Sequence, residues 1–278
     1  MNCSMQSILA TFGSKVSHAR LLSVLAVLSA ATPALAQSSA FQLDAAFGAS
    51  PQFHQTTWPT RVTSGPSGKS YVTFSNGSRL SGVNGLRRGA VMRLNADGTL
   101  DSGFNVGTQF TDAWALVEQA DGRVLVGAED ANESAESGLP LYRVFRLTAS
   151  GARDASYRSP VFAGIPRYMA LQPDGKLLVS HQGGTANGGL EGLQRLNSDG
   201  SLDTSFSAPA FASGAVIFSN IVVDAAGRIL IAGTFGAIGG QSRPGVARLN
   251  ANGSLDTTFV PSGFTLVQPG QIRGIALR

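Results

Sequence analysis

The stretch Arg248-Leu249-Asn250-Ala251-Asn252-Gly253-Ser254-Leu255-Asp256-Thr257-Thr258-Phe259 decides the fold. Asn252-Gly253 lies between two short apolar segments. This pair indicates a β-hairpin, because glycine readily takes the positive φ that a tight turn needs. A three-residue loop, built from a type I turn closed by a glycine bulge, fits the spacing best. It places Leu249 opposite Leu255 and Arg248 opposite Asp256.

The same pattern recurs along the chain. Its aspartates follow one another in steps of 57, 53, 49 and 53 residues, at Asp44, Asp101, Asp154, Asp203 and Asp256. An Arg-Leu block precedes each of the last four copies, so the same register forms the further pairs Arg93 with Asp101, Arg146 with Asp154, and Arg195 with Asp203. Opposite charges that face each other across a strand pair attract. We therefore expect an ion-paired rung in each copy; the alternative is a ligand site that repeats.

Each repeat also contains an earlier hairpin. Its clearest copy is Leu171-Gln172-Pro173-Asp174-Gly175-Lys176-Leu177-Leu178-Val179, in which proline presets the first turn residue and glycine closes the bulge. Related turns lie at Asp121-Gly122 and Ala226-Gly227 and, in weaker form, at Ser67-Gly68. The continuous apolar runs 124–126 and 229–231 suit strands that are covered on both faces. Two hairpins per repeat give four short strands.

Four-stranded units of this length are typical of a β-propeller. A β-helix fits less well, because its coils are shorter and lack a regular double hairpin. The 34 glycines suit many tight turns, and no helical period follows residue 36. We predict an all-β chain with four-stranded blades, in four complete units, a partial fifth and a lone last strand: 48–104, 105–157, 158–206, 207–259, 260–278 and 41–47. This count predicts an incomplete propeller, a truncated piece with exposed sheet edges and apolar faces.

Residues 1–36 have the pattern of a signal peptide, which makes 37–278 the mature domain. Lys15 and Arg20 precede an apolar core at 21–28, and Ala34-Leu35-Ala36 forms a small-x-small cleavage site. A membrane anchor is the alternative, but the apolar stretch is shorter than the roughly 20 residues of a span. We therefore expect a secreted or cell-surface protein without a stable membrane span.

The mature domain is nearly neutral and lacks cysteine. Loss of Lys15 and Arg20 leaves 19 basic residues against 17 acidic ones, and Cys3, the single cysteine, lies in the signal segment. No basic run or basic stripe interleaved with aromatic residues occurs, so the sequence does not indicate a nucleic-acid partner. A domain of this size can bury a sufficient core without disulfides.

The repeats resemble the delta-60 repeat family of bacterial extracellular proteins. The resemblance covers essentially all of 41–278. It rests on the stretches 171–179 and 248–259, and on Ala232-Gly233-Thr234-Phe235 followed by Gly239-Gly240, Arg243 and Arg248, which the first unit echoes with Phe74, Gly85, Arg88 and Arg93. It implies a fold similar to seven-bladed β-propellers and a surface location, often as a module of a larger protein. It implies no activity.

No histidine or cysteine pattern indicates a metal or cofactor site. His54 and His181 stand alone; His181 is expected in a partly exposed loop, with a funnel-facing position as the alternative. The acidic segment 129–136 is expected to be a solvated loop inserted between two strands, with Ca²⁺ binding as the alternative. Trp58 and Trp114 do not recur, whereas quinone-cofactor propellers repeat a tryptophan in every blade. We therefore expect no cofactor and assign no catalytic residues.

Two functions remain open. Asp97, Asp121, Asp174 and Asp199 recur with the turns, so they are expected to serve the fold. Phe53, Phe74, Phe110 and Tyr142 are candidates for a sugar-stacking platform or, more commonly for such residues, for the core. We expect a non-catalytic module that binds a protein or glycan at the cell surface. The alternative is a polysaccharide hydrolase or lyase, whose catalytic acids should converge near the axis and belong to one blade only.

Overall fold

The fold is that of a computed structural model, which describes residues 58–75, 89–134, 140–162, 164–183, 192–211, 218–261, 272 and 274–277. The predicted signal peptide, the strand at 41–47, His54, Phe53, Gly85 and Arg88 lie outside these ranges. All regular structure in the described residues is β-strand, which confirms the all-β prediction.

The strands form four three-stranded antiparallel sheets and one small hairpin. The first sheet contains β1 (Trp58–Ser64), β2 (Ser70–Ser75) and β3 (Val91–Leu94), and the second contains β4 (Phe110–Glu118), β5 (Val124–Ser134) and β6 (Pro140–Leu147). The third contains β7 (Gly164–Leu171), β8 (Leu177–Gly183) and β9 (Gly192–Leu196), and the fourth contains β10 (Phe218–Val223), β11 (Ile229–Gly233) and β14 (Val246–Leu249). The hairpin pairs β12 (Ala237–Ile238) with β13 (Gln241–Ser242).

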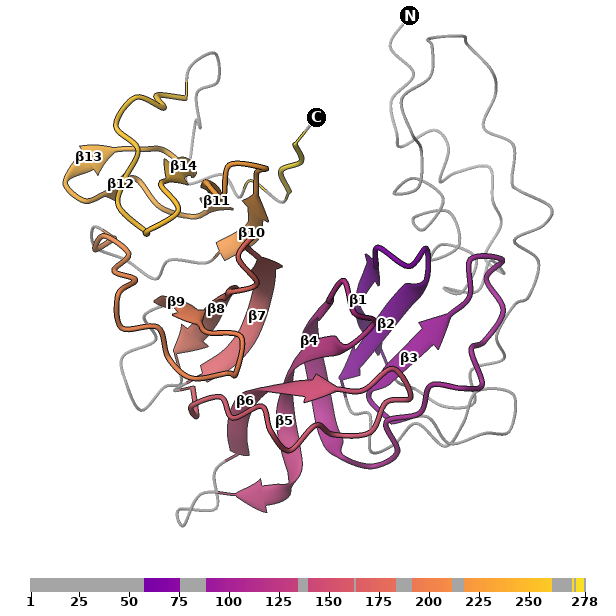
Figure 1. Ribbon diagram of the computed structural model, residues 1–278. Coiled ribbons are helices and arrows are strands. Elements are labelled where there is room, and N and C mark those ends of the chain that lie inside the picture. The colour runs from indigo at the N-terminus through magenta and orange to yellow at the C-terminus, as the bar shows by residue number, and fades with distance from the viewer. Residues whose placement is uncertain are drawn as a thin grey trace, which may run out of the picture.

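The four sheets follow one another along an arc (Figure 1). Their first strands, β1, β4, β7 and β10, are in contact in turn. Apolar clusters fill the spaces between successive sheets. For example, Phe104 shares one cluster with Phe145, and Leu178 shares another with Phe218. The core is therefore a series of layers between sheets, as expected for stacked blades.

The predicted turns have the expected geometry. In the first sheet, Gly98 has φ 82° and donates its N–H to the carbonyl of Asn95 at 2.9 Å, while the Asn95 N–H bonds the Thr99 carbonyl at 2.8 Å. The same pair of bonds closes the hairpin at 119–123 and its relatives. Leu249 pairs with Leu255, which confirms the register predicted around Asn252.

The predicted fourth strand is shorter than expected. In each sheet it is a single bridge, such as Leu94 with Leu100, instead of a ladder. The cause is local: the Phe104 N–H turns back to the Asp101 carbonyl at 3.3 Å, and the same turn follows Asp154, Asp203 and Asp256. The strand ends where this turn begins.

Candidate functional site

The predicted Arg–Asp rung is present in all four sheets. Arginine Nε lies 2.7 to 2.8 Å from aspartate Oδ2 in every pair: Arg93 with Asp101, Arg146 with Asp154, Arg195 with Asp203, and Arg248 with Asp256. Each arginine also lies over the aromatic ring that ends the motif, with distances of 4.5 to 4.9 Å to the ring centroid. The rung is therefore a packed ion pair, as the hairpin register predicts.

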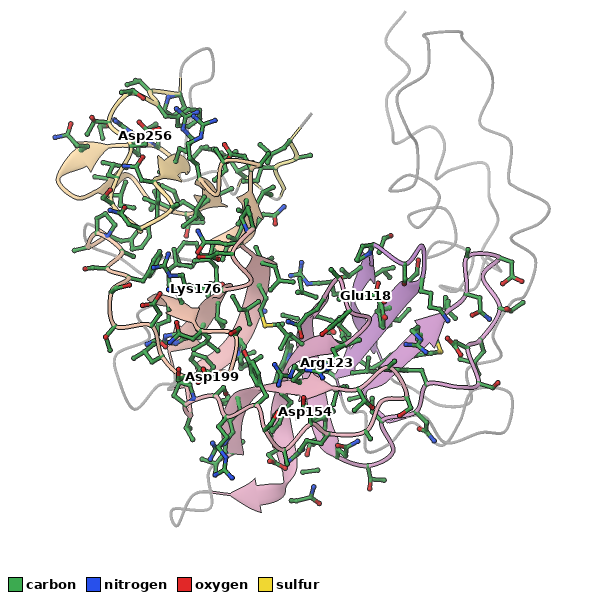
Figure 2. All side chains as sticks on the ribbon, viewed as in Figure 1. Glu118, Arg123, Asp154, Lys176, Asp199 and Asp256 are labelled. Atoms are coloured by element: carbon green, nitrogen blue, oxygen red, sulfur yellow. The ribbon has the colours of Figure 1, made fainter. Side chains whose placement is uncertain are left out.

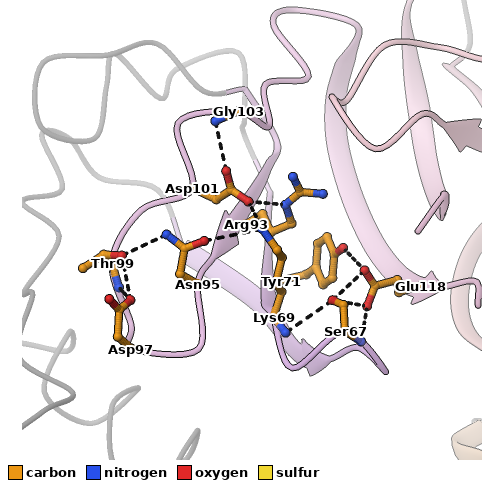
Figure 3. Close-up of polar contacts among 10 residues, drawn as sticks. All are labelled: Ser67, Lys69, Tyr71, Arg93, Asn95, Asp97, Thr99, Asp101, Gly103 and Glu118. Carbon is orange, nitrogen blue, oxygen red and sulfur yellow. Dashed lines mark hydrogen bonds and ion pairs between the residues drawn. The ribbon is translucent and has the colours of Figure 1, made fainter. Parts of the chain in front are cut away.

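A second cation reaches the same carboxylate in three sheets. Figure 3 shows Lys69 and Arg93 on Oδ2 of Asp101. Lys176 lies 2.6 Å from Asp203, and Arg123 lies 3.7 Å from Asp154. Figure 2 labels Arg123 and Asp154 close together in the second sheet, and Lys176 in the third. In the fourth sheet the corresponding Arg228 pairs with Asp224 instead, at 2.7 Å.

The other carboxylate oxygen is occupied as well. Oδ1 of Asp203 accepts both the backbone N–H and the hydroxyl of Ser205, at 3.0 and 2.6 Å. The bond from Lys176, followed by that from the Ser205 hydroxyl, holds the pKa of Asp203 well below its usual range. Asp154 and Asp256 have equivalent bonds from Ser156 and Thr258. These carboxylates have little bonding capacity left for a ligand.

The rung arginines also join successive sheets. Nη1 of Arg146 donates to the Ser198 carbonyl at 2.8 Å, and Nη1 of Arg195 donates to the Ala251 carbonyl at 2.5 Å. Both acceptors lie in the corresponding turn of the next sheet. The recurring charges therefore serve to hold the repeats together.

Glu118 is a buried acid that belongs to one sheet only. Figure 3 shows it bonded to the Tyr71 hydroxyl at 2.7 Å and to the Ser67 hydroxyl at 2.8 Å. Burial and the bond to Glu118 raise the pKa of Tyr71. Both residues that bond Glu118 belong to the first sheet, so this acid links the first two sheets.

A different set of unrepeated residues lies in the second sheet, in the half that is farther from the turn at 119–123. Glu129 of β5 lies directly opposite Tyr142 of β6. Asp112 immediately precedes Ala113 on β4, within the register shift between Phe110 and Ala113. The Trp114 ring contacts the Tyr142 ring edge-on, with centroids 5.6 Å apart and an interplanar angle of 70°. All four side chains are partly exposed. We call Asp112, Trp114, Glu129 and Tyr142 the aromatic–acid cluster.

The Asp112 carboxylate affects the titration of two neighbours in this cluster. Burial and the Asp112 carboxylate raise the pKa of Glu129. Burial and then both carboxylates raise the pKa of Tyr142. Like charges side by side on a sheet are unfavourable, and such perturbed groups concentrate at functional sites. The aromatic–acid cluster is therefore the candidate binding surface.

Trp114 is the bulged residue of β4, the first strand of the second sheet. The β4–β5 register shifts between Ala113 and Ala115, and equivalent shifts skip Thr60, Arg167 and Ser219 in β1, β7 and β10. Arg61 fixes this region, because its Nε donates to the Trp114 carbonyl at 3.3 Å and its Nη2 to the Arg167 carbonyl at 3.2 Å. Bulges of this kind re-aim side chains near sites.

The acidic segment 129–136 is not simply a solvated loop. Residues 129–134 continue β5, and the Asp130 side chain is only 1% exposed. It pairs with Arg153 at 3.1 Å. Arg153 stands where the other copies have leucine, and this substitution is the signal in the sequence for a buried acid partner.

The other candidate residues separate into core and strand positions. Phe74 and Phe110 are each 1% exposed and belong to the core, whereas Tyr142 belongs to the aromatic–acid cluster. His181 lies within β8 and not in a loop, its ring 5.4 Å from that of Phe162. Burial lowers the pKa of His181. Among the described residues, no group of three or more His, Cys, Asp or Glu is arranged to hold a metal ion.

A family model for a β-propeller domain of unknown function, DUF5122, matches residues 77–104, 119–157, 172–206 and 227–259. The chain belongs to this family. Each of the four matched segments ends on the aromatic residue of the rung motif, at Phe104, Tyr157, Phe206 and Phe259. The DUF5122 model thus matches the later part of each of the four repeats. No curated protein matches the sequence.

Several solved structures are similar to this DUF5122 chain. One is a gluconolactonase from Xanthomonas campestris, at 19% identity over 70% of this chain and 59% of that chain, with a TM-score of 0.45. Another is a GH74 xyloglucanase from the same organism, at 17% over 73% and 30%, with a TM-score of 0.44. A third is PorZ, a bacterial surface component of the type-IX secretion system of Porphyromonas gingivalis, at 11% over 72% and 27%, with a TM-score of 0.38. This chain thus spans about three fifths of the gluconolactonase.

The described part of the chain contains no helix with the length and apolar character that a membrane span needs.

Proposed function

We propose that this β-propeller chain is a secreted or cell-surface module that binds a protein or glycan without chemically altering it. The observation that carries the proposal is the state of the recurring carboxylates. Asp101, Asp154, Asp203 and Asp256 all spend their oxygens on arginine, on backbone N–H and, in three of the four, on hydroxyl groups. A repeated acid that is consumed in this way supports the fold and is unavailable for acid–base chemistry.

The proposed location rests on the sequence pattern of residues 1–36. A basic segment, an apolar core and Ala34-Leu35-Ala36 together are typical of export. The proposed binding surface is the aromatic–acid cluster, because partly exposed tryptophan and tyrosine present an apolar body and a polar tip to a ligand.

The experiment is a paired binding and turnover assay. Purified 37–278 is applied to a glycan array and to a panel of cell-surface proteins, and every ligand found is then incubated with the protein and analysed by mass spectrometry. We expect binding with an unchanged ligand mass. Cleavage of a bound ligand by the wild-type chain would contradict the proposal.

A polysaccharide hydrolase or lyase is the second candidate, and one observation favours it. Asp112 and Glu129 are two neighbouring carboxylates in a single sheet, and the pKa of Glu129 is raised. A raised pKa suits a general acid. If cleavage is detected and Glu129→Gln abolishes it while binding persists, this second function replaces the first.

A further inference from the structure

His181 of β8 has a ring nitrogen that the fold leaves without a partner. The residue is partly buried, and its Nδ1 atom is shielded from water and has no hydrogen-bond partner among the described residues. The Phe162 ring lies 5.4 Å from the imidazole and is tilted by 40°. A Cβ built on Gly192, which pairs with His181 across the sheet, would lie 2.6 Å from Nε2. The imidazole is therefore packed against both Phe162 and the β9 backbone.

A histidine at this position is specific to the third sheet. His181 pairs with Pro166, which lies just before the bulge of β7. By the same register, the position holds Phe74 in the first sheet, Ala128 in the second and Gly233 in the fourth. Phe74 and Ala128 are almost fully buried, and none of the three side chains titrates. The fold therefore accepts an aromatic ring or a small residue here, without needing a titratable group.

The elements packed against His181 carry no carboxylate in their described residues. These elements are β7, β9 and the segment 157–162, which contains Phe162, with β6 beyond that segment. Their charged or titratable side chains are Tyr157, Arg158, Arg167, Tyr168 and Arg195, and those of β6 are Tyr142, Arg143 and Arg146. A protonated His181 therefore gains no counter-ion from them.

Protonation changes what the imidazole needs from its surroundings. The neutral ring has one N–H donor and one bare nitrogen, whereas the imidazolium has a donor on both nitrogens. At His181 one of these donors is Nδ1, which has no acceptor. A phenyl ring such as that of Phe162 is only a weak acceptor. A buried donor without an acceptor is costly, and more so when it carries charge.

We propose that His181 makes the contact between the second and third sheets acid-sensitive, because its protonated ring leaves its place beside Phe162. Phe162 is 4% exposed and belongs to the apolar layer between these two sheets. Its N–H donates to the Tyr142 carbonyl of β6 at 2.8 Å. When the charged imidazole turns to water, the segment 157–162 loses its contact with β8 and the layer opens locally. This property is independent of the proposed binding function.

Linkage between protonation and folding fixes the pH range. A histidine of the unfolded chain titrates near pH 6.5, and burial lowers the pKa of His181 in the folded protein. The stabilisation from the neutral ring is therefore fully present above pH 6.5 and is lost as the pH falls from there through the folded-state pKa. Aspartates of the unfolded chain titrate near pH 3.9, so the acid transition of the rungs lies lower.

The test is hydrogen–deuterium exchange of 37–278 at pH 7.5 and 5.5, followed by mass spectrometry and corrected for the intrinsic exchange rates. We expect the amides of 157–162 and of 177–181 to open about threefold or more as often at pH 5.5. The amides of 229–233 in the fourth sheet are the internal control and should open equally at both pH values.

The fold itself supplies the matched variants. His181→Phe copies Phe74 of the first sheet and His181→Ala copies Ala128 of the second, so each removes the titratable group while keeping a side chain that this position accepts. Both should remove the pH dependence, and the second serves if the first disturbs the packing. His54→Gln changes the other histidine of 37–278 and should keep the pH dependence.

Three results overturn the inference. Equal opening of wild-type 157–162 at both pH values shows that protonation leaves the layer closed. A His181→Ala protein that keeps the wild-type pH dependence assigns it to another group, and equal acceleration at 229–233 shows a general loosening instead. Titration of the His181 ring by nuclear magnetic resonance gives a second measurement. A midpoint below pH 6.5 supports the inference, and a midpoint at or above that value contradicts it.

Discussion

Each rung aspartate divides its two oxygens between two kinds of partner. In Asp154, Oδ2 meets Nε of Arg146, while Oδ1 accepts the hydroxyl and the N–H of Ser156. In Asp101 the residue two places on is Gly103, so Oδ1 receives only the backbone N–H, at 3.0 Å. Hydrogen bonds to the ionised form stabilise that form. The rung is therefore stronger where the motif carries serine or threonine after the aspartate.

The rungs predict a loss of stability in acid. The Ser156 hydroxyl, the Ser156 N–H and Arg146 lower the pKa of Asp154 to about 2, and the Thr258 hydroxyl and Arg248 lower that of Asp256 to about 2. In the unfolded chain an aspartate titrates near pH 3.9. The stabilisation is therefore fully present above that value and is lost as the pH falls from about 4 to 2. The melting temperature, measured by circular dichroism from pH 6 to 2, should fall mainly in that window.

Ser156→Ala provides the control for this acid transition. Without the hydroxyl, the folded-state pKa of Asp154 rises, so the variant should gain less stability on going from pH 2 to 6 than the wild type does. A melting temperature that is flat between pH 4 and 2 would refute the role of the rungs.

The rung arginines of the third and fourth sheets differ in their exposure and in their contacts with a following sheet. The Arg195 side chain is 7% exposed and bonds the Ala251 carbonyl in the next sheet. The Arg248 side chain is 23% exposed, and within the described ranges its only hydrogen bond is to Asp256. Removal of one partner from a buried ion pair costs about 3 kcal/mol or more. Arg195→Met should cost that much in urea unfolding, and Arg248→Met clearly less. Equal losses would mean that the bond between sheets contributes nothing.

At the scale of elements, the glycine that closes the turn between the rung arginine and aspartate of the third sheet has two roles. Gly200 has φ 94°, and a Cβ there would lie 2.9 Å from the backbone of Arg158 in the preceding segment. Gly175 closes the earlier turn of the same sheet with φ 82°, and a Cβ there would meet nothing within 4 Å. Both turns need a positive φ, but only the rung turn packs closely against its neighbour.

This difference can be measured with one substitution at each turn. Gly175→Ala should cost about 1 kcal/mol in the free energy of unfolding, the strain of alanine at positive φ. Gly200→Ala should lose that amount and a further ~2 kcal/mol, because the added methyl group forces the turn away from Arg158. Urea denaturation of both variants gives the two values. Equal losses would show that the turn and the preceding segment can separate freely.

The rungs could be predicted from the sequence and the aromatic–acid cluster could not. Arg248 and Asp256 are eight residues apart in one hairpin, so the turn alone fixes their pairing. Asp112 lies within one register shift of the β4–β5 pair and is separated from the turn by another, which no local spacing reveals. The acidic segment 129–136 suggests an inserted, solvated loop, and only the unusual Arg153 in the rung motif indicates that Asp130 is buried and paired.

At the scale of the whole molecule, each sheet packs against one face of the preceding sheet and buries that face. Leu125 and Leu178 hold the same position, opposite the rung arginine of their sheet, and both are at most 1% exposed. Leu230 holds that position in the fourth sheet and is only partly buried. The stability of a sheet therefore depends on its neighbour, as in other repeat folds.

Arg61 adds a link of longer range, because it reaches from the first sheet to the second and the third. Its bonds to the Trp114 and Arg167 carbonyls and its position over Tyr168 all disappear in Arg61→Ala. Arg167→Ala keeps the carbonyl that Arg61 uses and removes only an exposed side chain. For a domain of this size each kcal/mol shifts the melting temperature by about 2–4 °C. By calorimetry we expect Arg61→Ala to melt roughly 4–8 °C below wild type, for a loss of about 2 kcal/mol. Arg167→Ala should melt at the wild-type temperature. If the two variants melt together, the first three sheets are held by their apolar layers and turns alone.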